Sequence, residues 1–283
     1  MLSEEALAPG LYLVATPLGN LGDLSPRARE TLSRASFLAS ESSSAAGHWL
    51  QLLDPQPRPR VLSYREASRD KDAALILRRL EEGAAVALIS DAGTPAISDP
   101  GWHLVDLARQ AGHPVWAVPG PCAAVQALSL AGFPCRRFSF EGFLAASGKA
   151  RREALARLNR EESPVVLYES PHRLLETLGD LATLDPRALF LGRELTKKFE
   201  EGWRGSTDAA VHAWREKRVQ GEFTLVLGPR PAQAEEQMVK APEESVSFVR
   251  SLGLPAKTSA AILKHFHPQL SKKELYGLFI DRP

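Results

Sequence analysis

The chain has 283 residues, of which 44% are hydrophobic and 24% are charged, and its formal net charge is +1. This composition is ordinary for a globular protein, and the length suffices for two domains with substantial cores. A near-neutral charge gives no global argument for nucleic acid as a partner, and no apolar run has the length that spans a membrane. Cys122 and Cys135 lack metal-ligand or redox spacing, which favours a reducing cytoplasm and predicts no metal site.

The chain begins with a pattern typical of an α/β fold. Residues 11–15 read as a short buried strand, residues 16–21 form a Gly/Pro-containing turn, and a helix starts near Ser25, whose hydroxyl suits a helix N-cap. Short apolar runs then alternate with helical segments as far as Val118, which is the signature of a parallel sheet. The helices expected in this part are residues 25–34, 71–81 and 101–109.

The most informative stretch is the loop at residues 90–101, which reads Ser-Asp-Ala-Gly-Thr-Pro-Ala-Ile-Ser-Asp-Pro-Gly. It follows an apolar strand at 85–89 and precedes an amphipathic run that starts at Trp102. Its two prolines and two glycines fix an unusual chain path, and its aspartates and threonine offer polar contacts. Such a loop after a strand places backbone amides at the edge of the sheet where open α/β sheets bind ligands, although it can also be a rigid connector.

A third turn of this kind, Pro119-Gly120-Pro121-Cys122, separates a strand at 115–118 from a small-residue helix at 123–131. Three such turns in one domain predict loops that converge on one crevice. The chain has no G-x-G-x-x-G fingerprint, and the stretch from Gly142 to Ala150 has neither the spacing nor the Ser/Thr of a phosphate loop. These patterns predict a site for an adenosyl-type or other small ligand held by backbone groups.

A second α/β unit follows, and then a short helical segment. The expected strands of the second α/β unit are residues 137–140, 165–168, 188–191 and 223–227. Its expected helices are residues 149–158, 172–181 and 208–215. A Pro/Gln/Glu/Ala-rich linker precedes three short helices at 243–252, 256–266 and 271–279, the size of a helix-turn-helix-like module. We therefore predict α/β domains at 1–119 and 120–228, a linker at 229–242 and a helical module at 243–283.

Six motifs, in the same order, resemble those of the tetrapyrrole-methylase-fold methyltransferases. They are residues 16–21, 90–101, 119–123, 140–144 (Phe-Glu-Gly-Phe-Leu), 168–173 (Tyr-Glu-Ser-Pro-His-Arg) and 193–197 (Arg-Glu-Leu-Thr-Lys). The resemblance runs from about Leu11 to Leu227 and continues toward the C-terminus. It implies two α/β domains of the tetrapyrrole-methylase type with a cofactor crevice between them, S-adenosylmethionine as the cofactor, and a homodimer.

Within this family the motifs are similar to those of enzymes that methylate a cytidine ribose 2′-hydroxyl in 16S ribosomal RNA. The resemblance therefore implies a cytoplasmic RNA methyltransferase whose partner is the small ribosomal subunit. It also implies cofactor contacts from eight residues, carried over by motif position: Leu18, Gly93, Thr94, Ile97, Pro121, Cys122, Tyr168 and Thr224. Small residues admit backbone contacts and apolar ones can sandwich adenine, although Leu18 and Ile97 can equally be ordinary core.

Methylation of a ribose hydroxyl requires removal of its proton, by a positioned base or with the help of a neighbouring cation. Among the ionisable residues of the motifs, the catalytic candidates are Glu169, Lys197 and Asp91. Glu169 follows a strand and can face the crevice, or it can cap or pair with the next helix. Lys197 can contact the acceptor, or pair with Glu200 or Glu201 in solvent. Asp91 can touch the substrate or shape its own loop.

Two basic stretches are candidates for RNA contact, because lysine and arginine attract phosphates without reading sequence. One stretch follows residue 148 and the other lies in the C-terminal segment, and arginines of two motifs join them. The RNA-binding candidates are Lys149, Arg151, Arg152, Arg173, Arg193, Lys272 and Lys273. Each stretch can also be an ordinary solvated helix face.

The chain departs from the family pattern at three places. After Glu41 it reads Ser42-Ser43-Ser44 where the family usually has an acidic residue, a threonine and an arginine. Arg65-Glu66-Ala67-Ser68 stands where histidines and an asparagine are usual, and Ala145 replaces a proline. The replaced polar groups are expected near the RNA or the reacting centre. Two alternatives therefore stay open: a same-fold methyltransferase acting on a corrinoid or porphyrin precursor, and a non-catalytic ribosome-binding relative.

Overall fold

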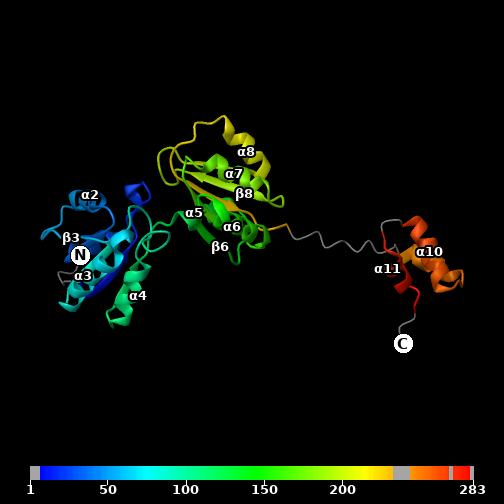
Figure 1. Cartoon of the computed structure of the whole chain (residues 1–283), viewed down its shortest axis with the longest axis horizontal. Helices are drawn as coiled ribbons and strands as arrows, with labels where there is room; N and C mark the ends of the chain where they lie inside the picture. Colours follow the sequence, from blue (N-terminus) through cyan, green and yellow to red (C-terminus); the bar gives the residue numbers. More distant parts are fainter. Residues whose placement is uncertain (1–6, 232–242, 268–269, 281–283) are drawn as a thin grey trace. The chain divides into compact units, whose positions relative to one another are not determined.

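The computed structural model describes every residue except 1–6, 232–242, 268–269 and 281–283. The chain forms two compact units, Met1–Pro229 and Arg230–Pro283. The larger unit holds two five-stranded sheets, the first drawn in blue to green and the second in green to orange-yellow in Figure 1. The sheets take their strands from either side of residue 119. Most of the predicted linker at 229–242 lies outside the described residues, and the bounds of the four predicted segments stay predictions.

The first sheet is wholly parallel, as the strand–helix alternation predicts, and its strand order is β3-β2-β4-β1-β5. Its strands are β1 (Gly10–Val14), β2 (Phe37–Ser40), β3 (Arg60–Ser63), β4 (Ala85–Ile89) and β5 (Val115–Val118). Its helices are α1 (Pro26–Arg34), α2 (Ser43–Leu53), α3 (Arg69–Glu81) and α4 (Trp102–Gln110), with 3-10 turns at Leu21–Asp23 and Glu66–Ser68. Helix α1 begins where expected because the Ser25 hydroxyl accepts a hydrogen bond from the Ala28 amide at 3.1 Å.

Both faces of the first sheet are covered by helices. Ala87 and Ile89 of β4 pack in the cluster that includes α1 and α2, whereas Val86 and Leu88 pack in the cluster that includes α3 and α4. Successive side chains of a strand point to opposite faces, so a strand covered on both sides reads as a continuous apolar run. This burial explains why β4 could be predicted from the sequence with its bounds unchanged.

The second sheet is mixed, with strand order β6-β7-β10-β8-β9. Strands β6 and β7 run parallel, and the other neighbours are antiparallel. The strands are β6 (Ser139–Phe143), β7 (Val165–Glu169), β8 (Ala188–Arg193), β9 (Glu201–Ser206) and β10 (Phe223–Leu227). The helices are α5 (Ala123–Ala131), α6 (Gly148–Arg160), α7 (Leu174–Ala182) and α8 (Thr207–Arg215). Helix α5 packs on one face of the sheet, and α6, α7 and α8 pack on the other.

The part of the smaller unit that the structure describes forms three short helices, in the segments predicted for them. They are α9 (Glu243–Ser251), α10 (Ala256–Phe266) and α11 (Lys272–Gly277). They share a small core of Val249, Ala260, Leu263, Leu270 and Leu275. Among the helices that the structure describes, none combines the length and hydrophobicity needed to cross a membrane.

Candidate active site

The three Gly/Pro turns of the first sheet lie side by side, because they leave the carboxyl ends of the adjacent strands β4, β1 and β5. Thr16 and Gly93 exchange two backbone hydrogen bonds of 2.8 and 2.9 Å, which join the first turn to the loop at 90–101. The Thr94 hydroxyl donates a hydrogen bond to the Pro121 carbonyl at 3.0 Å, which joins that loop to the third turn. The predicted convergence of the loops is therefore present in the structure.

The loop at 90–101 has a strained backbone. Ala96 and Ser98 adopt positive φ angles of 69° and 60°, in the region that usually requires glycine. A Cβ atom on Gly101 would lie 3.0 Å from the Cβ of Ala96, so the backbone at Gly101 lies too close to Ala96 for a larger residue at position 101. Strain of this kind costs about 1–3 kcal/mol per residue and concentrates at functional sites. Here it occurs in the loop that the sequence predicts to bind a ligand.

A pocket of about 340 Å³ lies where these loops meet the second sheet. This volume is within the range of small-molecule sites. Seven of the eight predicted cofactor residues line it: Leu18, Gly93, Thr94, Ile97, Cys122, Tyr168 and Thr224. The eighth, Pro121, is not among the lining residues but accepts the Thr94 hydrogen bond described above. The structure thus brings the predicted residues together, and their contacts with a cofactor stay a prediction.

Asp99 lines the pocket, although the sequence analysis did not single it out. Burial raises the pKa of Asp99 to about 6, and the negative charges of Asp91 and Glu41 act in the same direction, whereas a contact with Ser90 opposes them. A carboxylate with this pKa is ionised at neutral pH and is well matched to accept a proton there. The sequence could have indicated Asp99 only through its position in the loop at 90–101, and this position applies equally to Asp91.

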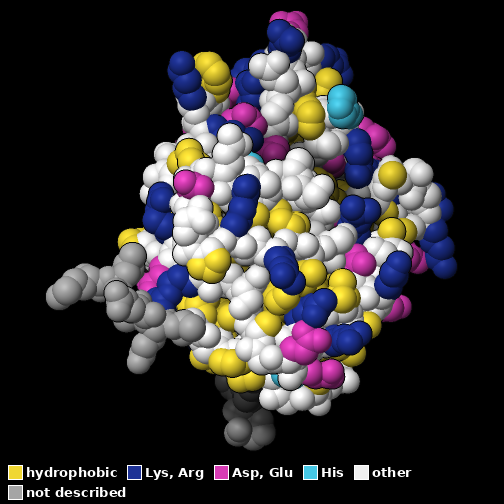
Figure 2. All heavy atoms as spheres, turned by 90° about the vertical axis from the view of Figure 1, so that its left-hand side faces the viewer, with side chains coloured by type: hydrophobic (Ala, Val, Ile, Leu, Met, Phe, Trp, Pro, Cys, Tyr) yellow, Lys and Arg dark blue, Asp and Glu magenta, His cyan; other side chains and the backbone are white. Residues whose placement is uncertain are grey.

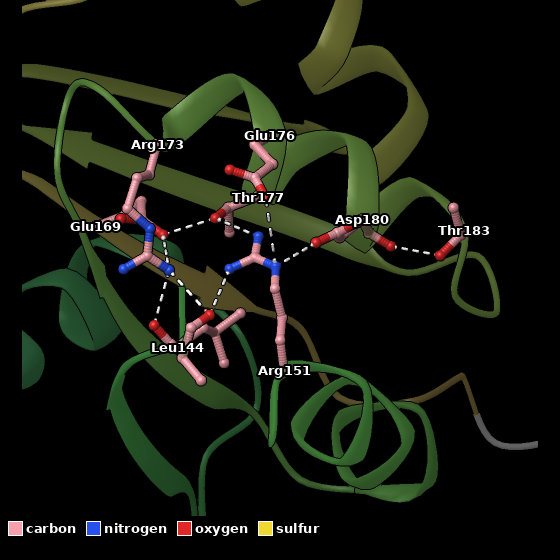
Figure 3. Close-up of polar contacts among 9 residues, drawn as sticks. Leu144, Arg151, Glu169, Arg173, Glu176, Thr177, Asp180 and Thr183 are labelled. Atoms are coloured by element: carbon pink, nitrogen blue, oxygen red, sulfur yellow. Dashed lines mark hydrogen bonds and ion pairs between the residues drawn. The ribbon is translucent and has the colours of Figure 1, made fainter. Parts of the chain in front are cut away.

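Glu169 also lines the pocket, but its carboxylate is engaged within the protein (Figure 3). The side chain is fully buried. One oxygen accepts a 2.8 Å hydrogen bond from the Ser170 amide, and the other accepts a 2.6 Å hydrogen bond from the Thr177 hydroxyl. The Arg173 guanidinium lies 3.7 Å from the second oxygen. This geometry favours the alternative considered for Glu169, a partner of the following helix.

Arg151 corrects the expectation of an exposed basic run on α6. Its side chain is only 6% exposed, because the first turn of α6 faces α7 there. Its guanidinium bonds to the Asp180 carboxylate at 2.6 Å, to the Thr177 hydroxyl at 3.0 Å and to the Ala145 carbonyl at 3.0 Å (Figure 3). A guanidinium held in this way cannot also reach RNA. We therefore remove Arg151 from the RNA-contacting set and keep its exposed neighbour Arg152.

Lys197 is paired with carboxylates other than those expected. Its Nζ lies 2.9 Å from Glu194 and 3.1 Å from Glu222, and Glu222 lines the pocket. Burial by itself would lower the pKa of Lys197, but the hydrogen bonds to these two carboxylates outweigh burial and raise it. Lys197 is therefore a fixed cation near the pocket and not a proton acceptor. Asp91, by contrast, is exposed at the pocket wall.

The remaining RNA-binding candidates divide into outward and inward side chains. The exposed ones are Lys149, Arg152, Lys272 and Lys273. Arg173 and Arg193 are turned inward, toward the Leu144 carbonyl at 2.7 Å and the Gln220 carbonyl at 2.8 Å. On the face shown in Figure 2, basic side chains are interspersed with acidic ones, as the small net charge predicts. RNA contact by the outward group stays a prediction.

Two of the departures from the family pattern have local structural roles. The Ser42 hydroxyl caps α2 by accepting a hydrogen bond from the Ala45 amide at 3.2 Å. The Ser68 hydroxyl and the Arg65 amide both donate to the Asp72 carboxylate, at 2.7 and 3.1 Å. The serines thus stabilise the loops after β2 and β3 even though they lack the charged groups usual in the family.

Comparison with known proteins places these observations in a family. The Tetrapyrrole (Corrin/Porphyrin) Methylases family matches residues 10–211. The chain is 38% identical over 281 residues to "Ribosomal RNA small subunit methyltransferase I" of Synechocystis, which covers 96% of this chain and 97% of the relative. Proteins of the same name from Escherichia coli and Xylella fastidiosa are 39% and 44% identical, covering 96% and 77% of this chain and 95% and 81% of the relatives.

Solved structures with the same fold are more distant in sequence. Uroporphyrin-III-C-methyltransferase from Thermus thermophilus superposes with a TM-score of 0.54 at 21% identity, covering 78% of this chain and 94% of that one. Diphthine synthase gives a TM-score of 0.61 at 12% identity, covering 77% and 89%. These likenesses confirm the predicted fold, two α/β domains of the tetrapyrrole-methylase type. The chain belongs to the tetrapyrrole methylase family, in the group of proteins named ribosomal RNA small subunit methyltransferase I.

Proposed function

We propose that this protein transfers a methyl group from S-adenosylmethionine to the 2′-hydroxyl of a cytidine ribose in 16S ribosomal RNA of the small subunit. Relatives named for methylation of small-subunit ribosomal RNA match nearly the whole chain. The observation that carries the proposal is the pocket at the strained loop of residues 90–101, which combines the predicted cofactor residues with a carboxylate of raised pKa.

The residues of the pocket suit S-adenosylmethionine in shape and charge. Ile97 and Tyr168 offer apolar surface for an adenine ring, and Thr94 and Thr224 offer hydroxyls. A Cβ atom on Gly93 would lie 3.0 Å from the Leu18 side chain, so a larger residue at this position would crowd Leu18 at the pocket wall. When bound, the cofactor supplies an electrophilic methyl group on a positively charged sulfur. The acidic groups at the wall favour a cation of this kind.

Asp99 is the group best suited to take the proton of the ribose hydroxyl. It lines the pocket, and with a pKa of about 6 it is mostly ionised at neutral pH and suited to accept a proton there. Lys197, held by Glu194 and Glu222, supplies a fixed positive charge for a phosphate of the substrate. Glu169 has both oxygens engaged and acts as a positioning residue for the pocket wall.

The exposed basic side chains on α6 and α11 provide contacts for the RNA backbone, as predicted for Lys149, Arg152, Lys272 and Lys273. The partner that follows from this proposal is the small ribosomal subunit. A homodimer and a cytoplasmic location, both implied by the family resemblance, belong to the same proposal.

The experiment that tests the function is transfer of a radiolabelled methyl group from S-adenosylmethionine to small subunits that lack this modification, followed by nuclease mapping. Label on the ribose of a single cytidine is the expected result. Cofactor binding without transfer to RNA would contradict the proposal and favour a corrinoid or porphyrin precursor as the acceptor. Failure to bind the cofactor would favour a non-catalytic ribosome-binding protein.

A further inference from the structure

Phe143 presents an aromatic ring to solvent at the wall of the pocket. It is the last residue of β6, lines the pocket and is 55% exposed. One side of the ring is supported by Tyr168, whose ring lies edge-on with the two centroids 5.7 Å apart. Single exposed aromatic rings are common on protein surfaces, so Phe143 is distinguished by its place at the pocket and by the way the backbone around it is held.

The backbone that follows Phe143 is held by two arginines (Figure 3). Arg173 donates hydrogen bonds to the Leu144 carbonyl at 2.7 Å and to the Ala145 carbonyl at 3.2 Å. Arg151 donates a further one to the Ala145 carbonyl at 3.0 Å. Hydrogen bonds from charged donors are stronger than neutral ones, so this turn is firmly fixed.

The arginines are themselves anchored. The Thr177 hydroxyl accepts from Arg151 at 3.0 Å and donates to Glu169 at 2.6 Å, which links the guanidinium to a buried carboxylate. Asp180 accepts a second hydrogen bond from Arg151 at 2.6 Å. The network therefore connects β7, α6 and α7 to the turn after Phe143, and little freedom remains in the backbone that carries the ring.

The backbone before Phe143 is fixed as well. The pairing of β6 with β7 contains an irregularity between Phe140 and Gly142, and Gly142 has a φ of 60°. A Cβ atom on Gly142 would lie 2.5 Å from the Ser98 hydroxyl of the strained loop. Phe143 thus follows directly on a close contact with the loop at 90–101, while its ring stays uncovered.

We propose that Phe143 is a base-stacking residue, whose ring packs against an unpaired nucleobase of the RNA at or next to the acceptor ribose. This inference rests on the proposed function. Proteins that recognise single-stranded RNA stack splayed bases on exposed aromatic rings, and a rigid ring binds at a lower entropic cost. The carboxylates of Asp91 and Asp99 line the same pocket and would repel a phosphate, so a neutral base is the better match for the space beside this ring.

The test compares the unmodified protein with Phe143→Leu and Phe143→Tyr in methyl transfer to small subunits that lack the modification. Phe143→Leu is expected to lower kcat/KM for the subunit about tenfold or more, mainly through KM, while the Kd for S-adenosylmethionine by calorimetry changes less than twofold. Phe143→Tyr keeps the ring and is expected to stay within about threefold of the unmodified protein. Phe138→Leu is the matched control, because Phe138 is 44% exposed and lines a different surface hollow.

Several outcomes would overturn the proposal. A parallel loss of cofactor binding in Phe143→Leu would show that the ring contacts the cofactor instead of the RNA. An unchanged kcat/KM, or an equal loss in Phe138→Leu, would show that the ring has no specific role. Thermal melts of each variant identify a loss that comes from unfolding. If the unmodified protein transfers no methyl group to the subunit, the proposed function itself fails, and this inference fails with it.

Discussion

Two of the carboxylates that line the pocket, Asp99 on the loop after β4 and Glu169 at the end of β7, differ in their surroundings. Asp99 belongs to the strained loop after β4, where burial and the negative charges of Asp91 and Glu41 raise its pKa to about 6. Glu169 ends β7 on the second sheet, fully buried, with hydrogen bonds to both of its oxygens. The first wall of the pocket, formed by the loop after β4, holds a carboxylate whose ionised form is destabilised. The second wall, formed by the second sheet, holds a carboxylate whose hydrogen bonds stabilise the fold.

This difference indicates that one carboxylate takes part in the reaction and the other stabilises the fold. A carboxylate whose oxygens are already hydrogen-bonded stabilises its surroundings and is a poor proton acceptor, whereas one held at a raised pKa is suited to take a proton. Both residues follow strands and both lie in family motifs, so their roles depend on what each side chain touches. Substitutions on the two walls should therefore have opposite signatures: lost rate on the first wall and lost stability on the second.

The largest expected effect on the first wall is that of Asp99→Asn. A general base typically contributes a factor of about 10²–10⁴, so we expect kcat to fall at least about 100-fold while cofactor affinity changes little. Single-turnover methyl transfer measures this effect. Asp91→Asn is the matched control, because Asp91 is an exposed aspartate of the same loop, and its effect should be smaller. An equal loss in both variants would contradict a special role for Asp99.

The same substitution should change stability in a pH-dependent manner. The pKa of Asp99 is about 6 in the fold and near 3.8 as a free side chain, so the folded protein binds its proton more tightly. The ionised group therefore destabilises the fold progressively as pH rises from about 4 to about 6, and the full penalty is present above that window. Chemical denaturation should find Asp99→Asn more stable than the unmodified protein at pH 7.5, with the difference vanishing below pH 4.

On the second wall, Arg151→Met should lower stability, whereas Arg152→Met should not. Removing Arg151 leaves the Thr177 hydroxyl without its donor, leaves the Ala145 carbonyl with only the hydrogen bond from Arg173, and removes the ion pair with Asp180. Removing one partner of a fully buried pair costs about 3–5 kcal/mol, and the loss here should be smaller because the Asp180 side chain is 33% exposed. Arg152 is exposed and its replacement should change the free energy of unfolding by less than about 0.5 kcal/mol. Equal stability of the two variants in urea would refute the buried role of Arg151.

Cys122→Trp tests the space between the two walls. Cys122 lines the pocket and is partly buried, so an indole there should occupy part of the volume that the cofactor needs. We expect the affinity for S-adenosylmethionine to fall about tenfold or more, which corresponds to about 1.4 kcal/mol or more. Calorimetric binding that is unaffected by the substitution would remove Cys122 from the proposed site.

A smaller loss of stability than that of Arg151→Met is expected from Thr177→Val. This change keeps the shape of the side chain but removes the hydroxyl that links Arg151 to Glu169, at a cost of about 1–3 kcal/mol. Thr177→Ser keeps the hydroxyl and should recover most of that loss. If valine and serine were equally stable in thermal unfolding, the hydroxyl would not contribute to the support of the second wall.

Much of the fold could be predicted from the sequence, because hydrophobic periodicity and turn residues act locally. Strand Ala85–Ile89 and helix Ala123–Ala131 have the predicted bounds. Strand β9 (Glu201–Ser206) was missed, because Gly202 and Gly205 weaken its apolar pattern and it is stabilised by antiparallel pairing with β8. Helix α2 (Ser43–Leu53) was missed because its N-terminal serines were read only as a departure from the family pattern.

The candidate site was predictable in its location but not in its roles. Three Gly/Pro turns identified the loops that meet at the pocket, since the carboxyl ends of neighbouring parallel strands share one edge of a sheet. The burial of Arg151 and the hydrogen bond from Thr177 to Glu169 depend on α7, a helix distant in sequence from Arg151. The raised pKa of Asp99 likewise depends mainly on its burial in the fold, with smaller contributions from the negative charges of Asp91 and of Glu41, which follows a different strand.

The pH dependence of single-turnover methyl transfer to small ribosomal subunits tests the contrast between the two walls most directly. We expect the rate of the unmodified protein to fall on the acid side of its pH profile, with a midpoint near pH 6, which is the pKa of Asp99. Glu169→Gln should keep this acid limb of the profile at a similar midpoint. Asp99→Asn should show a low rate that does not fall further at acidic pH. A limb near pH 6 that persists in Asp99→Asn, or that disappears in a folded Glu169→Gln protein, would contradict the assignment.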